Sequence, residues 1–332
     1  MKAQVLDRPD AVENKPLHLH ELARPVPAPA ELLIHVHVCG ICHTDLHVVE
    51  GELPKPKLPL IPGHEIVGHV EAVGTGVTRF QIGQRVGIPW LHSSDQTCSF
   101  CSSGHENLCE AARFTGYTVN GGYAEYVTVP QDYAVAIPEQ FSDVEAAPLL
   151  CAGIVGYRSI CLSDLQHGER LGLYGFGASA HICIQVARHW GCEVYAFTRG
   201  KEHQRHAQEL GASWVGPAQD KPPQFMDRSI IFAPEGSLVP LALGHLRKGG
   251  TLCINAIQMN DLPPMPYPLL WNERTIRSVA NATRQDAEDF MSLAGTIPIH
   301  TETQTFDLES ANEVLSMVKH SEIKGAAVLQ IT

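Results

Sequence analysis

Short apolar runs separated by turn residues dominate the first 130 residues of the chain. Residues 31–39 are rich in β-branched and apolar side chains and predict a strand, and residues 66–74 predict another that ends in a glycine turn. Further strands are predicted at 80–88 and 121–130. Because no stretch here repeats with the period of a helix, this part of the chain predicts a small β-barrel-like domain.

The pattern changes to alternating strands and helices after residue 151. The sequence predicts a helix directly after this residue and another after the turn at 175–180. A third helix is predicted from 238 to 247, with Ser237 as its N-cap. The strands predicted in this part are 169–174, 193–197, 229–234 and 251–254. Alternation of this kind is typical of a doubly wound parallel sheet.

The last part of the chain predicts a helix from 286 to 293 and a strand at 326–329. The length of 332 residues suggests about two domains. Hydrophobic residues make up 44% of the chain and charged residues 18%, a globular balance that permits a large core. The net charge of −12 disfavours nucleic acid and anionic membrane surfaces as partners.

The cysteines change the picture because of their expected compartment. The first residues contain no apolar signal-peptide core, and no run of about 18 apolar residues predicts a membrane span. We therefore expect a cytoplasmic protein whose ten cysteines are mostly reduced. Clustered cysteines in such a chain are typical of metal sites rather than disulfides.

One candidate metal site joins residues 39–47, which read CGICHTDLH, to residues 62–65, which read PGHE. Thiolate and imidazole groups are zinc ligands, and a carboxylate can join them. A catalytic zinc needs three protein ligands and one open position. Cys42 and His64 supply two ligands, and Cys151 is the best candidate for the third.

A second candidate metal site is of the structural type. Cys98, Cys101 and Cys109 are spaced by three and eight residues in a loop rich in Ser and Gly, which predicts structural zinc. A closed site needs a fourth ligand, and Asp95 lies three residues before the first thiol. The alternative fourth ligands are His92 and His105. Three free thiols are disfavoured because exposed free cysteine is a liability.

A nucleotide-binding loop is predicted between the strand at 169–174 and the following helix. Its residues match the pattern G-x-G-x-x-A and are Gly175, Phe176, Gly177, Ala178, Ser179 and Ala180. Glycines at these positions permit a tight turn and the close approach of a pyrophosphate to the helix N-terminus.

The end of the second strand of this part indicates the cofactor. An acid at this position would bond the ribose 2′-hydroxyl of NAD, but the residues here are Thr198, Arg199, Gly200 and Lys201. A hydroxyl and cations suit a 2′-phosphate, so the sequence favours NADP. NAD remains possible if Arg199 stacks on the adenine of either cofactor.

In this order, the motifs resemble those of the zinc-dependent medium-chain alcohol dehydrogenases, in the branch related to cinnamyl alcohol dehydrogenases. The resemblance covers essentially the whole chain. It implies a GroES-like β-rich catalytic domain at 1–150 with a structural-zinc lobe at 92–112, and a Rossmann domain at 151–284. Residues 285–332 would return to complete the catalytic domain. The resemblance also implies a homodimer or homotetramer.

The resemblance further implies roles at the catalytic zinc. Cys42, His64 and Cys151 would hold the ion, with water or substrate oxygen in the fourth position. Glu65 would be a transient ligand or lie just behind the ligands. Asp45 would orient His64 through its second ring nitrogen.

The remaining implied roles concern the proton, the cofactor and the substrate. Thr44 and His47 would form a proton relay, and His43 and Arg284 would face the cofactor pyrophosphate. Two more residues would line the substrate pocket, namely Leu53 and Trp90.

The expected reaction is reversible hydride transfer between NAD(P)(H) and a primary alcohol or aldehyde. One alternative is a polyol dehydrogenase of the same superfamily. The other is a non-catalytic relative that binds zinc or nucleotide, since one fold hosts many functions.

Overall fold

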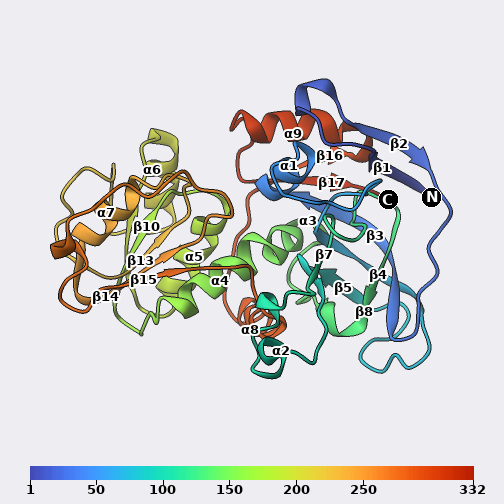
Figure 1. Ribbon diagram of the computed structural model, residues 1–332, viewed down its shortest axis with the longest axis horizontal. Coiled ribbons are helices and arrows are strands. Elements are labelled where there is room, and N and C mark those ends of the chain that lie inside the picture. The colour runs from blue at the N-terminus through green and yellow to red at the C-terminus, as the bar shows by residue number, and fades with distance from the viewer. The chain divides into compact units, whose positions relative to one another are not determined.

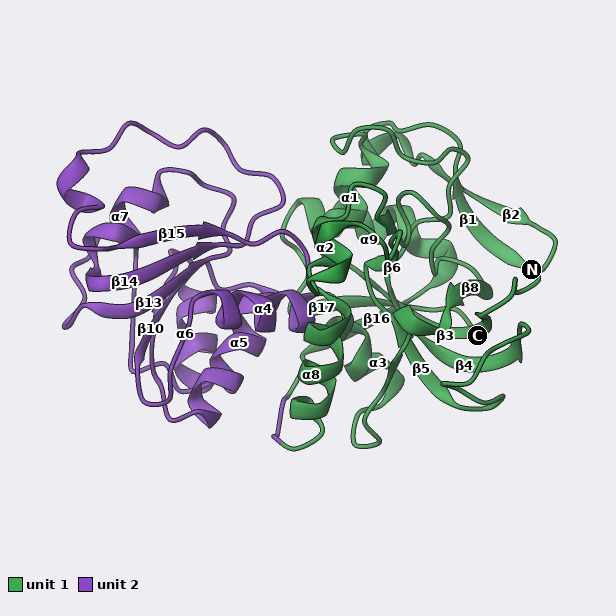
Figure 2. Cartoon of the chain, turned by 60° about the horizontal axis from the view of Figure 1, so that its bottom comes forward, with its two compact units in different colours: residues 1–151, 282–296, 300–332 green, residues 152–281, 297–299 purple.

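The computed structural model describes residues 1–332. The chain forms two compact units, which Figure 2 distinguishes by colour. Unit 1 contains residues 1–151, 282–296 and 300–332, and unit 2 contains residues 152–281 and 297–299. Unit 1 therefore takes both ends of the chain, and unit 2 is inserted between them in the sequence.

Unit 1 is built on a seven-stranded sheet whose order is β16-β17-β3-β4-β5-β9, with β8 also paired to β3 (Figure 1). Its strands are β3 (Glu31–Ile41), β4 (Glu65–Val73), β5 (Arg85–Ile88), β8 (Tyr126–Pro130), β9 (Val135–Ala136), β16 (Thr303–Asp307) and β17 (Ala326–Gln330). Two small antiparallel pairs accompany it: β1 (Lys2–Leu6) with β2 (Leu17–Glu21), and β6 (Leu91–Ser93) with β7 (Arg113–Phe114).

The helices of unit 1 are mostly short and connect these strands. The α-helices are α1 (His43–Val49), α2 (Ser99–Ser102), α3 (Asp143–Ala146), α8 (Arg284–Ala294) and α9 (Ala311–Lys319). The 3₁₀ turns are η1 (Val12–Asn14), η2 (Glu106–Leu108), η3 (Gln131–Tyr133), η4 (Ala147–Leu150) and η6 (Leu308–Ser310).

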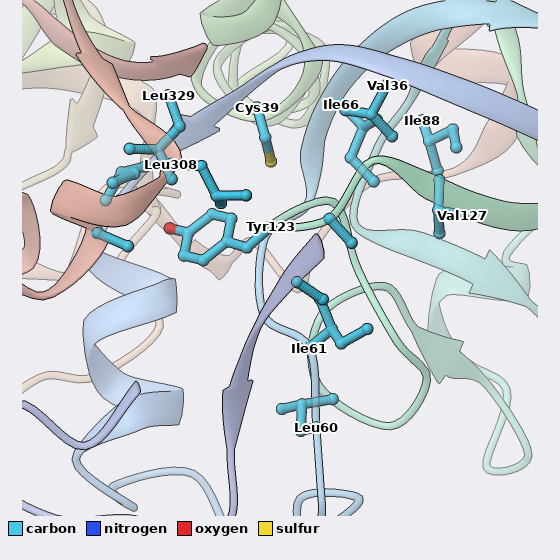
Figure 3. Packing of buried hydrophobic residues seen from close by; sticks show 14 of the residues in the cluster. Val36, Cys39, Leu60, Ile61, Ile66, Ile88, Tyr123, Val127, Leu308 and Leu329 are labelled. Atoms are coloured by element: carbon cyan, nitrogen blue, oxygen red, sulfur yellow. The ribbon is translucent and has the colours of Figure 1, made fainter. Parts of the chain in front are cut away.

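The core of unit 1 depends on the alternation of side chains along β3. Ile34 and Val36 are fully buried, whereas His35 and His37, on the other face, are only half-buried. Figure 3 shows this core, in which side chains from strands far apart in the sequence pack together. The hydrophobic pattern therefore fixes the register of β3, because a slip of one residue would expose the buried set.

Unit 2 is built on a six-stranded parallel sheet in the order β12-β11-β10-β13-β14-β15. Numbered from its own first strand, this order is 3-2-1-4-5-6, the order of a dinucleotide-binding Rossmann sheet. The strands are β10 (Arg170–Tyr174), β11 (Glu193–Phe197), β12 (Trp214–Gly216), β13 (Met226–Ile231), β14 (Leu246–Ile254) and β15 (Thr275–Ser278).

Helices cover both faces of the unit 2 sheet (Figure 2). The helices are α4 (Ala152–Leu162), α5 (Ala178–His189), α6 (Lys201–Glu209), α7 (Leu238–Gly244) and the 3₁₀ turn η5 (Tyr267–Leu269). Figure 2 shows α4 and α5 on one face and α7 on the other. The predicted α/β class, a β-rich unit joined to a doubly wound parallel sheet, is confirmed.

Several predicted element boundaries are wrong. The strand expected at 80–88 is confined to β5, and the one expected at 121–130 begins only at Tyr126. The helix expected to reach residue 247 ends at Gly244, because residues 246–250 join β14 instead. Ser237 is the N-cap of this helix as predicted, but its hydroxyl donates to the Glu235 carboxylate at 2.8 Å and makes no capping hydrogen bond.

No single helix is long and apolar enough to cross a membrane. The bent helix pair Asp143–Leu150 and Ala152–Leu162 reaches the required length and apolar composition only when its two helices are taken together.

The hydroxyl of Tyr123 generates a stability prediction. This side chain is fully buried in the core of unit 1 (Figure 3), and its hydroxyl has no hydrogen-bond partner. A buried polar group without a partner is destabilising, so we expect Tyr123→Phe to leave stability unchanged or raise it by about 1 kcal/mol.

Urea denaturation of a matched pair of variants checks this expectation. In the same unit, the hydroxyl of Tyr133 lies 2.8 Å from Ser94 Oγ, so Tyr133→Phe should cost about 1 kcal/mol. A similar loss of stability in both variants would contradict the assignment of an unpaired Tyr123 hydroxyl.

Candidate active site

Cys42 lies at the junction between β3 and α1, where it is the N-cap of the helix. Its thiol sulfur accepts from the backbone N–H of Thr44 at 3.3 Å, and the Asp45 carboxylate accepts from the Cys42 N–H at 2.9 Å. This reciprocal capping box fixes both the helix start and the direction of the thiol.

His64 is fixed by its backbone and by its ring. Gly63, just before it, has a φ of +96°, and a Cβ there would lie 2.4 Å from the Tyr123 ring, so only glycine fits. The His64 Nδ1 lies 3.0 Å from Asp45 Oδ1, which leaves Nε2 to face Cys42 Sγ at 3.3 Å. Trp90 packs edge-on against the imidazole, with ring centroids 4.8 Å apart.

Cys151 completes the cluster from the end of η4. Its sulfur lies 4.0 Å from the Cys42 sulfur. One potential ligand atom from each of Cys42, His64, Glu65 and Cys151 lies within 4.8 Å of all the others. The fold thus brings together two thiols, an imidazole and a carboxylate from segments more than 100 residues apart.

The spacing of these atoms fits a tetrahedral zinc ion. Zn–S and Zn–N bond lengths imply separations of about 3.8 Å between two sulfurs and about 3.6 Å between sulfur and nitrogen. The observed separations are 4.0 Å between Cys42 and Cys151 and 3.3 Å between Cys42 and His64. Glu65 is buried as well, and its Oε2 has no hydrogen-bond partner. A buried, unpaired carboxylate oxygen beside thiols is suited to a cation.

The electrostatics of the cluster also favour a cation. Contact with Cys151, together with the charge of His64, holds the pKa of Cys42 well below its usual value despite burial. Burial raises the pKa of Glu65 well above its usual value, and the neighbouring Cys42 raises it further. Burial lowers the pKa of His64, but Asp45 and Cys42 together raise it well above its usual value. Negative groups therefore compete for the single imidazole, and a divalent ion would relieve this competition.

The second cluster gathers Asp95, Cys98, Cys101 and Cys109, again with ligand atoms within 4.8 Å of one another. The Cys98 and Cys101 sulfurs are 3.5 Å apart, close to the separation that a tetrahedral zinc requires. Asp95 Oδ1 accepts from the N–H groups of Thr97 and Cys98 at 2.8 and 2.9 Å. These bonds hold the pKa of Asp95 below its usual range.

The alternative fourth ligands lie in other environments. His92 is buried and interacts with Ser93, and His105 interacts with Ser103. Neither histidine belongs to the cluster of the three thiols, whereas Asp95 does. The arrangement of the lobe therefore favours the carboxylate.

The lobe is also bonded to α8. Glu106, which is buried, accepts from the backbone N–H of Arg284 at 2.8 Å and lies 3.4 Å from its Nε. The guanidinium of Arg284 also lies over the Tyr133 ring, 5.2 Å from its centroid. Arg284, for which the family resemblance implies a contact with the cofactor pyrophosphate, is thus held by the lobe of its own unit.

The proposed relay residues occupy α1. Thr44 is half-buried in its first turn, and His47 lies one turn further along, with its side chain 20% exposed. His47 Nδ1 pairs with the Glu52 carboxylate. Leu53 packs against the core of unit 1. The roles of these residues, and of His43, stay predictions.

Unit 2 contains a pocket at the carboxyl ends of its central strands. The residues that line it include Gly175, Thr198, Arg199, Gln219, Ala233 and Glu235. Gly175 has a φ of +87°, and a Cβ there would lie 2.9 Å from the Ala233 nitrogen, so the tight turn needs glycine. This is the position at which ligands bind to doubly wound sheets.

The rest of the nucleotide loop serves the fold around this pocket. Gly177 is the N-cap of α5, which begins at Ala178. Phe176 is buried, with its ring 6.0 Å from that of His206. Two further residues of the loop lie in α5, namely Ser179 and the fully buried Ala180.

The cations expected to read the cofactor differ in their placement. Thr198 and Arg199 line the pocket, whereas Lys201 opens α6 and donates to Gln204 at 3.3 Å. The Arg199 guanidinium lies 3.4 Å from the Glu235 carboxylate. Sequence reasoning missed Glu235. Its position in the loop just after the parallel strand β13, where such sheets bind ligands, is the signal by which it could have been found.

The chain matches the family of the alcohol dehydrogenase GroES-like domain over residues 28–139. It matches the zinc-binding dehydrogenase family over residues 180–296. The chain belongs to the zinc-binding alcohol dehydrogenases.

Similar proteins extend over the full length of this alcohol dehydrogenase. A Mycobacterium tuberculosis protein named "Probable alcohol dehydrogenase AdhA" is 46% identical over 337 residues, covering 100% of this chain and 97% of the relative. An alcohol dehydrogenase of Geobacillus stearothermophilus is 36% identical over 340 residues, covering 100% of both chains. The solved structure of a cinnamyl alcohol dehydrogenase from Sorghum bicolor superposes with a TM-score of 0.90 at 26% identity, covering 99% of this chain and 97% of that one.

The predicted family and enzyme class are thereby confirmed. The protein is an oxidoreductase that takes zinc and a nicotinamide cofactor and acts on an alcohol or aldehyde. Its fold is that of its family, with a GroES-like β-rich unit and a Rossmann unit.

The carboxylate in the second cluster of this dehydrogenase generates a prediction. Asp95→Asn keeps an acceptor oxygen for the N–H groups of Thr97 and Cys98 but removes the charge that would bind zinc. Loss of even an outer partner of a metal site costs about tenfold to a hundredfold in affinity, so this change should weaken zinc binding at least about tenfold.

Zinc content after graded chelation measures this effect. Asp95→Cys supplies a fourth thiol at this position, and the variant should retain zinc at least as well as the unchanged protein. In Asp95→Asn, the melting temperature should fall clearly, whereas turnover should change little. Equal zinc retention by Asp95→Asn and the unchanged protein would rule out Asp95 as a ligand.

Proposed function

We propose that Cys42, His64 and Cys151 hold the catalytic zinc of this alcohol dehydrogenase. The observation that carries the proposal is the convergence of two thiols and one imidazole on a common point, with ligand atoms no more than 4.8 Å apart. Asp45 supports it, because a carboxylate on the second nitrogen of a ligating histidine fixes its tautomer and its direction. Glu65 would be a transient ligand of the same ion or lie just behind the three ligands.

The chemistry expected at this site is reversible alcohol oxidation and aldehyde reduction. When bound, a zinc ion supplies a Lewis acid that polarises a carbonyl oxygen or acidifies an alcohol. The chain must then move a proton. The Thr44 hydroxyl can both accept and donate, and His47 can pass the proton to water because its ring is partly exposed. The Glu52 carboxylate orients His47 by pairing with Nδ1, which leaves Nε2 for transfer.

The cofactor favoured by this proposal is NADP. Thr198 and Arg199 line the pocket at the end of β11, where the 2′ position of the adenosine ribose binds in Rossmann sheets. The Arg199 side chain is 81% exposed, so its guanidinium has room to turn from Glu235 toward a phosphate. With NADPH as donor, aldehyde reduction is the favoured direction.

The proposed assembly is a homodimer or homotetramer. Supporting this, unit 2 exposes large apolar side chains in the segment before its edge strand β15, among them Ile257, Tyr267 and Trp271. Exposed apolar groups of this size commonly mark contacts between subunits.

Substitution of a zinc ligand tests the proposed site. Cys42→Ala or His64→Ala should remove one zinc per chain and lower turnover on the order of a thousandfold or more, since a Lewis acid supplies several kcal/mol. AMP should still bind, because the nucleotide pocket belongs to unit 2. Zinc analysis, initial rates and AMP calorimetry measure the three properties.

Cys39→Ala is the matched control for that experiment. Cys39 is a fully buried thiol three residues away that belongs to neither cluster. The Cys39→Ala protein should keep its zinc and its turnover rate. Full activity in a Cys42→Ala protein that lacks the ion would refute the proposed site.

The cofactor proposal is tested by initial rates with NADPH and NADH on one reactive aromatic aldehyde, such as cinnamaldehyde. The unchanged protein should prefer NADPH. Arg199→Ala should lower kcat/KM for NADPH by about tenfold to a hundredfold and barely affect NADH, because hydrogen bonds to charged groups contribute about 1.5–3 kcal/mol.

Arg205→Ala is the control for this series. Arg205 is an exposed cation of α6 that pairs with Glu209 outside the pocket, so its loss should change neither rate. A preference for NADH in the unchanged protein would assign Arg199 to adenine stacking.

A further inference from the structure

The loop after β13 places a carboxylate inside the nucleotide pocket. β13 ends at Ile231, and the N–H groups of Phe232 and Ala233 donate to the Tyr174 carbonyl at the end of β10. These bonds bring the loop against the turn at Gly175. Glu235 follows and lines the same pocket as Arg199.

Glu235 is held in this position by its neighbours. Its backbone N–H donates to the Ala233 carbonyl at 2.8 Å, and the hydroxyl of Ser237 donates to Oε1 at 2.8 Å. The next residue, Gly236, donates to the side chain of Asn260. The carboxylate therefore has one oxygen occupied by Ser237 and the other directed at Arg199.

The pair with Arg199 lies at the surface. Its N···O distance is 3.4 Å, and the side chains are 81% exposed for Arg199 and 39% for Glu235. Such a pair is weak and can be broken by a better anionic partner. A phosphate is such a partner because it offers bidentate hydrogen bonds to the guanidinium.

We propose that Glu235 is a specificity-determining residue, which lowers the preference of the pocket for a 2′-phosphate by holding Arg199. The inference rests on the proposed function of Arg199 as the reader of that phosphate. It assigns to the loop after β13 the acid that Rossmann sheets otherwise carry after their second strand. A 2′-phosphorylated nucleotide must displace Glu235 from Arg199, whereas a nucleotide with a 2′-hydroxyl leaves the pair intact.

Adenosine 2′,5′-bisphosphate and AMP are the probes for a test, because they differ only in the 2′-phosphate. Their dissociation constants are measured by calorimetry on the zinc-loaded, full-length protein. In Glu235→Gln, the affinity for the bisphosphate should rise roughly threefold to tenfold, as expected for loss of an exposed pair and of a like charge. The affinity for AMP should change less than about twofold.

Two further variants separate this specific effect from a structural one. Glu209→Gln removes an acid of α6 that pairs with Arg205 away from the pocket, and it should leave both affinities unchanged. In an Arg199→Ala background, Glu235→Gln should lose most of its effect, because the two residues act as a pair.

The outcomes bear separately on the two proposals. An unchanged ratio of the two affinities in Glu235→Gln overturns the inference, as does a full-sized effect without Arg199. If the unchanged protein binds AMP more tightly than the bisphosphate, the preference for NADP fails. The role of Glu235 would still be supported in that case if the ratio shifts between variants and the shift requires Arg199.

Discussion

A single buried carboxylate, that of Asp45, determines the geometry of the catalytic cluster. One oxygen accepts from the backbone N–H of Cys42 and the other lies 3.0 Å from His64 Nδ1, so the same group starts α1 and turns the imidazole. Burial raises the pKa of Asp45, whereas His64 opposes this shift. Because Asp45 is fully buried, its charge is tolerated only while both contacts persist. The positions of thiol and imidazole are therefore not independent.

The surroundings of Asp45 explain why the cluster suits a divalent ion. Cys42, Glu65 and Cys151 cluster around the one imidazole of His64, whose other nitrogen lies against Asp45. The hydrogen bond with Cys42, together with burial, raises the pKa of Cys151 well above its usual value. Burial and the charge of Cys42 do the same to the pKa of Glu65, so proton loss from either group needs a compensating positive charge. A bound metal ion would supply that charge, and its binding would couple proton release to the ordering of the ligating side chains.

The sequence predicts those parts of the protein that depend on local patterns. Strand β11 was expected at its observed bounds, and the spacing of Asp95 and the three thiols of the lobe matches a compact cluster. Contacts that depend on strand order were not predictable. Glu235 and Arg199 are 36 residues apart in the sequence. They meet because β11 and β13 run parallel on either side of β10 and therefore end at the same edge of the sheet. The end of α7 was predicted too late for a related reason. Residues 246 and 247 belong to β14, and the position of that strand in the sheet is not visible in the local sequence.

The second cluster is connected to Arg284 by contacts that no local pattern shows. Cys101 donates to Ser94, whose hydroxyl also bonds that of Tyr133, and the Tyr133 ring lies beneath the Arg284 guanidinium. Glu106, between two thiols of the lobe in sequence, binds Arg284 from 178 residues away. Order in the lobe therefore fixes the first residue of α8.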